Sequence, residues 1–213
     1  MPLRKFDILH VNDFEPLPTA WLVKKFNSKM KLVYDSHEYQ REKNGLGGMT
    51  KKMIEMLEPI MIKSADAVIT VSEGIEMEYK RLFNLKEVTV IFNAPHKVDV
   101  IKKDLFRDRF KLPKEVKIFL YQGAFHANRG VEQVIEAFGQ MQGENVAAVF
   151  MGSGPLQSKV EEGSEKFSNV FYHPAVPYSE ILEHTGSADF GLLTTENVCL
   201  NHYFCMPNKL FEY

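Results

Sequence analysis

Short apolar runs recur along the chain at intervals of roughly twenty to thirty residues, and this spacing constrains the fold more than any other feature. The runs cover residues 7–11, 31–35, 67–71, 88–92, 117–121, 146–151, 170–172 and 189–193. They are nearly continuous in apolar residues and rich in Val, Ile and Phe, which is typical of parallel strands buried on both faces. Apolar residues at helical spacing lie between them, as at residues 131–138. The alternation predicts right-handed βαβ units and a doubly wound α/β fold.

The first series of strands ends at residues 92–95, and a charged helical stretch at 102–111 follows. We therefore expect a partial N-terminal Rossmann-like domain at residues 1–98 and a linker at 99–114. A partial C-terminal Rossmann-like domain is expected at 115–213.

Both sheets are expected to be incomplete, because the first strand begins shortly after Met1 and the last helix runs into Tyr213. Residues 7–11 and 189–193 would then form exposed strand edges. Such edges pair readily with other chains, so we expect self-association.

The composition of the 213 residues excludes several classes of protein. Lys and Arg number 26 against 28 Asp and Glu, so no overall basic charge points to nucleic acid. No apolar stretch approaches the ~20 residues of a membrane span. Two cysteines fit neither a disulfide framework nor a zinc site and indicate a reducing compartment. We expect a cytoplasmic protein.

Polar and glycine residues gather directly after the strands, where open α/β sheets bind their ligands. The cleft residues expected on this ground are Asp35, Glu38, Ser72, Asn93, Gly152 and Gly154. His37 lies among carboxylates after a buried strand, so it is a candidate for binding a sugar hydroxyl or for proton transfer. A loop histidine bonded to backbone is the alternative. A metal site is disfavoured, because no second His or Cys lies at ligand spacing.

Residues 121–130 form a strand, a glycine turn and the start of a helix. Gly123 allows close backbone approach, the helix start at Gly130 offers free N–H groups, and Arg129 adds a cation. Together they are candidates for holding a diphosphate. A plain turn between strand and helix is the alternative.

Near the end of the chain, Lys209 and Glu212 lie three residues apart and share a helix face. One interpretation is a lysine that binds phosphate beside a carboxylate that accepts two ribose hydroxyls. The other is a surface ion pair, which contributes little to stability.

Eight segments taken in order resemble family 4 (group 1) glycosyltransferases, which have the GT-B architecture of two Rossmann-like domains. The matching segments are residues 6–13, 33–38, 65–72, 90–93, 121–132, 151–155, 188–191 and 207–213. They cover essentially the whole chain. The resemblance implies transfer of a sugar, with retention, from a nucleoside-diphosphate sugar to a glycan or lipid-linked acceptor in cell-surface polysaccharide biosynthesis.

The resemblance also implies roles for single residues. His37 matches the histidine near the transferred sugar, and Gly123 the glycine that faces the diphosphate. Arg129 matches the cation of the diphosphate site, with Asn208 and Lys209 at the start of the donor-side helix. Glu212 matches the glutamate that holds the ribose. No metal or other cofactor is implied, and peripheral membrane contact by the full-length protein is compatible with the family.

Three departures from the family pattern matter. Ala124 stands where many members have an arginine, and Phe204 where the first glutamate of the common pair is expected. Family members are also much longer, so this chain alone is expected to be inactive or weakly active. The alternatives are a non-catalytic nucleotide-binding fragment and a sugar-nucleotide epimerase of the same architecture, although residues 207–213 disfavour the epimerase.

Overall fold

Two parallel four-stranded sheets, one in each of two units of the chain, organise the fold of the computed structural model, which describes residues 6–43, 45–99 and 102–213. The first unit comprises Met1–Asn93 and Asn197–Met206. The second comprises Ala94–Glu196 and Pro207–Tyr213. The predicted α/β class with two parallel sheets is confirmed.

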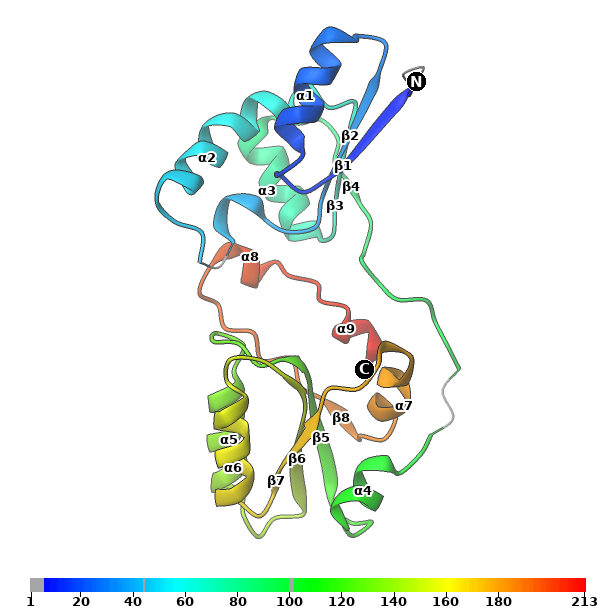
Figure 1. The fold of residues 1–213 in the computed structure, drawn as a ribbon, viewed down its shortest axis with the longest axis vertical. Helices are drawn as coiled ribbons and strands as arrows, with labels where there is room; N and C mark the ends of the chain where they lie inside the picture. Colours follow the sequence, from blue (N-terminus) through cyan, green and yellow to red (C-terminus); the bar gives the residue numbers. More distant parts are fainter. Residues whose placement is uncertain (1–5, 44, 100–101) are drawn as a thin grey trace, which may run out of the picture. The chain divides into compact units, whose positions relative to one another are not determined.

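The sheet of the first unit has its strands in sequence order, all parallel. They are β1 (Ile8–Asn12), β2 (Lys31–Ser36), β3 (Ala67–Thr70) and β4 (Thr89–Val90). The connecting helices are α1 (Leu17–Phe26), the 3-10 turn η1 (Gln40–Glu42), α2 (Gly48–Ile62) and α3 (Glu73–Phe83). In Figure 1 the three α-helices all lie on the same side of these strands.

One apolar cluster fills the space between these helices and the sheet. Leu32 and Tyr34 of β2 point into it and are fully buried, whereas the alternate residues Val33 and Asp35 are only half-buried. The prediction of strands buried on both faces is therefore wrong for this unit. The physical reason is that the described helices cover one face alone, so burial alternates along each strand.

The second sheet has the strand order β7-β6-β5-β8, again all parallel. Its strands are β5 (Lys117–Ala124), β6 (Val146–Ser153), β7 (Val170–Pro174) and β8 (Phe190–Gly191). The helices of this unit are α4 (Leu105–Phe110), α5 (Val131–Gln140), α6 (Gln157–Lys166), the 3-10 turn η2 (Tyr178–Glu180), α7 (Ile181–Thr185) and α9 (Lys209–Glu212).

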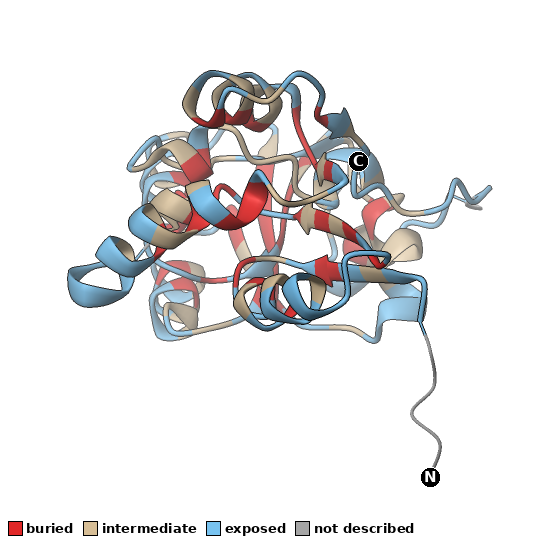
Figure 2. Ribbon diagram, turned by 90° about the horizontal axis from the view of Figure 1, so that it is seen from above, coloured by how far each residue is buried: buried red, intermediate tan, exposed pale blue. Residues whose placement is uncertain are grey.

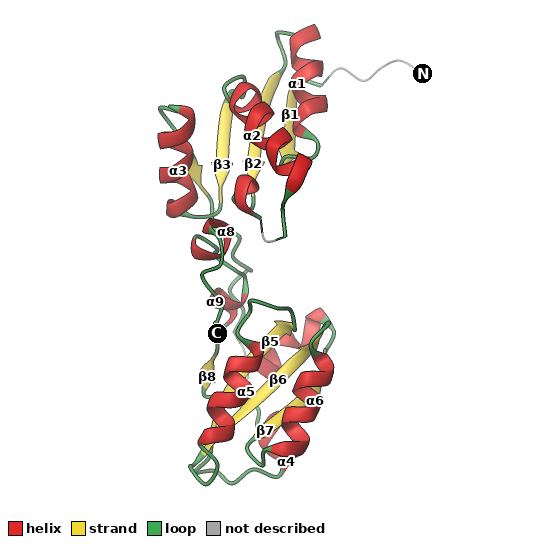
Figure 3. Cartoon of the chain, turned by 90° about the vertical axis from the view of Figure 1, so that its left-hand side faces the viewer, coloured by secondary structure: helices red, strands yellow, loops and turns green. Residues whose placement is uncertain are grey.

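Both faces of this sheet are covered. Tyr121 and Phe150 belong to an apolar cluster beneath α5 and α6, which lie side by side in Figure 3. Ile118 and Val149 belong to a second cluster on the opposite face, closed by Phe106 of α4. Burial on both faces, as the apolar runs predict, is confirmed here. Buried residues lie along the strands and on parts of the helices, and some, such as Phe125, lie in loops (Figure 2).

Two segments differ from the predicted boundaries. Residues 105–110, expected in the linker, form α4, and Phe106 is fully buried in the second unit. Arg107 donates to the Asp189 carboxylate at 2.7 Å, which fastens α4 to that unit. Residues 100 and 101 of the predicted linker lie outside the described residues.

Residues 197–206, expected in the C-terminal domain, belong to the first unit and carry α8 (Leu200–Tyr203). The Tyr39 amide donates to Oδ1 of Asn201 at 2.7 Å, and the Phe204 ring packs edge-on against Tyr39. A Cβ on Gly74 would lie 2.2 Å from this phenylalanine, so the glycine makes room for the ring. Apolar packing therefore places residues 197–206 in the first unit, and the pattern of apolar runs along the sequence does not reveal this packing.

The strands β1 and β8 are edge strands of the described sheets, at the positions expected. Every helix in the described ranges is too short or too polar to cross a membrane.

Candidate functional site

Three glycines let the chain come close to itself where β5 and β6 end. Gly123 and Gly152 are partners in the parallel register, and a Cβ on Gly152 would lie 1.9 Å from the Gly123 carbonyl oxygen. A Cβ on Gly154 would lie 2.7 Å from the backbone of Phe125. Gly123 has a φ of +112°, which L side chains rarely adopt. Gly123 itself is exposed, and a Cβ there would meet only Lys209 Nζ at 3.8 Å, so its backbone is open to a ligand.

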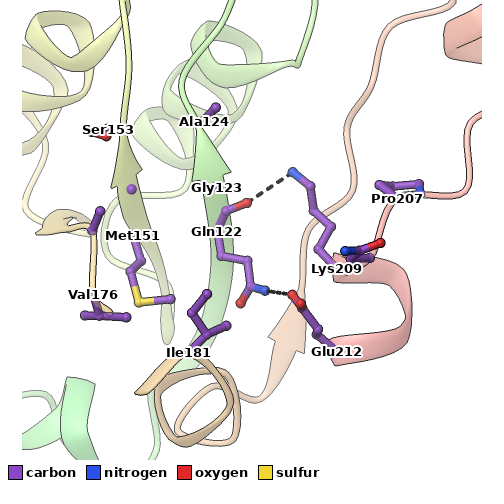
Figure 4. A pocket seen from close by; sticks show the side chains of 13 residues that line it. Gln122, Gly123, Ala124, Met151, Ser153, Val176, Ile181, Pro207, Lys209 and Glu212 are labelled. Carbon is purple, nitrogen blue, oxygen red and sulfur yellow. Dashed lines mark hydrogen bonds between the residues drawn. The ribbon is translucent and has the colours of Figure 1, made fainter. Parts of the chain in front are cut away.

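A cavity of about 370 Å³ lies beside this bare backbone. It is lined by the strand ends, by residues that follow β7 and by the start of α9, including Asn208, Lys209 and Glu212. Nζ of Lys209 donates to the Gln122 carbonyl at 3.1 Å and would lie 3.8 Å from a Cβ on Gly123 (Figure 4). The cavity thus combines a cation, a carboxylate and exposed backbone.

Gln122 connects the carboxylate to the sheet. Its side-chain amide donates to Oε2 of Glu212 at 2.5 Å, as Figure 4 shows. On its other side, the Thr185 hydroxyl donates to Oε1 of Gln122 at 2.7 Å. Only 5% of Gln122 is exposed. Glu212 is therefore not a plain surface ion-pair partner of Lys209, since its bond runs to a buried amide.

Tyr213 fixes α9 to the second sheet. Its hydroxyl accepts from the backbone N–H of Gln122 at 3.3 Å and lies 3.2 Å from the backbone carbonyls of Leu120 and Leu192. A Cβ on Gly191 would lie 2.1 Å from the tyrosine ring, so the ring rests directly on the backbone of β8. Burial raises the pKa of Tyr213 to about 12, and the phenol keeps its proton as a donor.

Arg129 and Gly130 occupy the turn before α5. Gly130 has a φ of +73°, and a Cβ there would lie 2.4 Å from the Thr194 carbonyl. The Arg129 carbonyl accepts from the hydroxyls of Tyr121 and Thr194. Arg129 does not line the 370 Å³ cavity, so its role at a diphosphate stays a prediction. Gly154 also lies outside the lining, whereas Gly152 belongs to it.

In the first unit, His37 lies in a cluster at the ends of β1 and β2. Its backbone amide donates to Oδ1 of Asp13 at 3.0 Å, and its Nε2 lies 3.4 Å from Oδ1 of Asp35. Nε2 of His10 lies 3.0 Å from the other oxygen of Asp35. One half-buried carboxylate thus lies between two exposed imidazoles, an arrangement suited to hydrogen bonding with hydroxyl groups.

The remaining cleft candidates of this unit have separate surroundings. Glu38 pairs with Nζ of Lys43 at 3.1 Å. The Ser72 hydroxyl accepts from the Ile75 amide at 3.3 Å, which makes it the N-cap of α3. Asn93 is exposed beyond β4. The structure brings His37 and Asp35 together, whereas the contacts described for Glu38 and Ser72 run to other residues.

Sequence reasoning missed Gln122, Thr185 and Tyr213 as parts of the site. For Gln122 the sequence offered one signal, which is a polar residue directly after the apolar run 117–121. Within the described ranges, no group of three or more His, Cys, Asp or Glu residues is arranged to hold a metal ion.

Two family profiles match the sequence in succession. The profile described as Glycosyltransferase Family 4 matches residues 2–94. The profile described as Glycosyl transferases group 1 matches residues 102–202. A search of the curated proteins by sequence gave no match.

Solved structures with the same fold include sucrose-phosphate synthase from Thermosynechococcus elongatus, with 18% identity and a TM-score of 0.66 over 88% of this chain and 50% of that one. The Anabaena protein HepE in complex with UDP and glucose has 15% identity and a TM-score of 0.66, covering 89% and 53%. The lipopolysaccharide outer core galactosyltransferase WaaB has 16% identity and a TM-score of 0.60, covering 89% and 50%. The chain thus spans about half the length of each.

Proposed function

The chain belongs to the glycosyltransferases that join a family 4 domain to a group 1 domain, and from this premise we propose that it serves sugar transfer from a nucleoside-diphosphate sugar. The transfer proceeds with retention, as the family resemblance implies. The acceptor is a glycan or a lipid-linked sugar of a cell-surface polysaccharide. WaaB, a galactosyltransferase of the lipopolysaccharide outer core, supports this acceptor class.

The single observation that carries the proposal is the convergence on one cavity of Gly123, Lys209 and Glu212. Bare backbone and an ammonium group suit the charge of a leaving diphosphate, which they stabilise as it develops. A carboxylate suits the paired hydroxyls of a ribose, because an ionised carboxylate is an acceptor with two oxygens. HepE, which shares the fold, is described in complex with UDP and glucose, and this supports a nucleotide donor.

The other assignments follow from the resemblance and complete the proposal. His37 lies near the transferred sugar, and Arg129 supplies a further positive charge for the diphosphate. Transfer requires no metal, because cations and backbone amides stabilise the leaving group. The protein acts in the cytoplasm, and the full-length protein contacts the inner face of the membrane peripherally.

Calorimetric titration of the 213-residue chain with UDP and with GDP tests donor binding. We expect saturable heat with one of them, and at least tenfold weaker binding in Lys209→Met, because the cation is lost. Lys159→Met is the matched control, since Lys159 lies on α6 and pairs with Glu162. Absence of heat with both nucleotides at millimolar concentration contradicts the proposal.

Nucleotide binding without transfer is the second candidate, and Phe204 favours it. A carboxylate expected at this position is replaced by a ring that packs against Tyr39. Radiolabelled sugar nucleotides with isolated native lipid acceptors test the second candidate. We expect little or no turnover by this chain alone, whereas robust turnover would exclude the binding-only reading.

A further inference from the structure

The most tightly connected polar side chains near the donor cavity are Gln122, Thr185 and Glu212, and sequence patterns assign no function to the first two. Gln122 lies on β5, Thr185 at the end of α7, and Glu212 on α9. Three elements that are far apart in sequence thus meet through one side-chain amide.

The orientation of that amide follows from the chemistry of its neighbours. An ionised carboxylate can only accept, so the NH₂ group of Gln122 must face Oε2 of Glu212, at 2.5 Å. The carbonyl then faces the Thr185 hydroxyl, which donates to it at 2.7 Å. The reverse orientation would set two acceptors against each other. The Thr185 hydroxyl also lies 2.9 Å from the Ile181 carbonyl, which fixes it to its own helix.

The hydrogen bonds from Thr185 to Gln122 and from Gln122 to Glu212 restrain the Glu212 carboxylate, which lies on a short helix. The helix α9 has four residues, and a glutamate has three side-chain torsions that must be fixed before it can bind. The bond from Gln122 restrains Oε2, and it is the side-chain hydrogen bond seen for Glu212 in the described ranges. A restrained carboxylate loses less conformational entropy when a ligand arrives.

We propose that Gln122, held by Thr185, is a positioning residue that presets Glu212 to receive the two hydroxyls of the donor ribose. The inference rests on the proposed function. It assigns ribose recognition to the triad of Gln122, Thr185 and Glu212, with Glu212 as the residue that touches the ligand. It also predicts that the preference for a ribose with both hydroxyls depends on β5 and α7.

Calorimetric titration with UDP and GDP, each compared with its 2′,3′-dideoxy analogue, tests the assignment in the 213-residue chain. We expect Gln122→Leu to weaken binding of the parent nucleotide about tenfold, the usual effect of losing a hydrogen bond to a charged group. Binding of the dideoxy analogue should stay unchanged. Equal weakening of both, or of neither, would overturn the proposal.

Gln133→Leu is the matched control, because Gln133 donates to Oε1 of Glu196 at 3.2 Å on the exposed surface of the same unit. It should leave both affinities unchanged. Thr185→Val, which keeps the shape of the side chain, should reproduce part of the effect of Gln122→Leu.

A measurement without nucleotide separates failure of this inference from failure of the proposed function. In the wild-type chain, the side-chain amide protons of Gln122 should give two separated and slowly exchanging NMR signals. Glu212→Ala and Thr185→Val should each move these signals toward the values of exposed glutamines. If neither change moves them, the triad does not exist in solution, whatever the chain binds. If they move but no nucleoside diphosphate binds, ribose recognition is overturned together with the proposed function.

Discussion

The two units have the same parallel α/β architecture but place their polar groups differently. In the second unit, helices cover both sheet faces, and the candidate donor residues are fixed by glycine backbone and by the buried Gln122. In the first unit, the described helices cover one face, and a carboxylate, Glu58, is buried within the core. Its histidine cluster around Asp35 is partly exposed.

This difference shows that one fold can hold chemical groups in two ways. Glycine backbone and the buried Gln122 position the second unit's site. Titratable side chains characterise the first unit, and its stability should depend on pH. The single tryptophan, Trp21 on α1, makes the comparison measurable, because its fluorescence reports the first unit alone.

The largest expected effect comes from Gly152→Val. The new side chain would start 1.9 Å from the Gly123 carbonyl oxygen, and strand backbone cannot move aside easily. We expect a loss of more than about 3 kcal/mol of unfolding free energy in the second unit, together with loss of nucleotide binding. Urea unfolding followed by far-UV circular dichroism should shift, while the Trp21 transition stays in place.

Gly47→Ala is the control for this change, because a Cβ on Gly47 meets nothing within 4 Å. A Gly152→Val chain that unfolds and binds nucleotide like wild type would mean that β5 and β6 do not approach as described.

Glu58→Gln should have the next largest effect, which should grow as pH rises from 4.5 to about 7. Burial raises the pKa of Glu58 to about 7, although Tyr34 and Tyr79 donate to its Oε1 and partly oppose the shift. The folded state therefore binds the proton more tightly than the unfolded state, whose ordinary value is 4.5. Stability from this group is present at low pH and is lost as pH rises through about 7.

The loss amounts to about 3 kcal/mol at most, and glutamine, which cannot ionise, should abolish it. Unfolding in urea at pH 5 and pH 8, followed by Trp21 fluorescence, measures the difference. Glu87→Gln, an exposed position between α3 and β4 of the same unit, is the control. An equal pH dependence in wild type and Glu58→Gln would contradict the prediction.

Asp66→Asn should destabilise the first unit by about 1 kcal/mol. In contrast to Glu58, Asp66 is a carboxylate whose pKa is lowered in the folded state. Asp66 pairs with Lys24 and Lys31 and accepts from the Leu32 amide at 2.8 Å. The Lys24 ammonium and the Leu32 amide hold the pKa of Asp66 well below its usual range. The contribution of Asp66 to the free energy of unfolding is fully present above pH 3.8, the ordinary pKa of an aspartate. It is lost as pH falls below 3.8 toward the lowered pKa of the folded state.

Trp21 fluorescence in urea at pH 7 measures this destabilisation, and high salt should reduce it because the pairs are near the surface. A stability unchanged by the substitution would show that the Asp66 ion pairs do not persist in solution.

The smallest effect on stability is expected for Ile8→Lys on the edge strand β1. Ile8 is 60% exposed, so the change in unfolding free energy should stay within about 0.5 kcal/mol. A lysine on an open edge disfavours pairing with a second chain, however. Light scattering should show association of the wild type and a smaller species for the variant. A monomeric wild type would contradict the expected self-association.

The order of the strands, the parallel sheets and the glycine turn before α5 were predictable from sequence, whereas α6 and α8 were not predicted. These features are local, because apolar periodicity and turn residues depend on neighbours along the chain. Lys209 and Glu212 were predictable in the same way, as polar residues at a helix start.

The tertiary structure alone decided which of these residues meet. Gln122 and Thr185 are 63 residues apart, and no periodic pattern links them to Glu212. The assignment of residues 197–206 to the first unit depends on the space that Gly74 leaves for Phe204. Whether a strand is buried on one face or two likewise depends on where helices pack. Such contacts join distant segments through shape and hydrogen bonding, and the order of residues along a chain does not encode them locally.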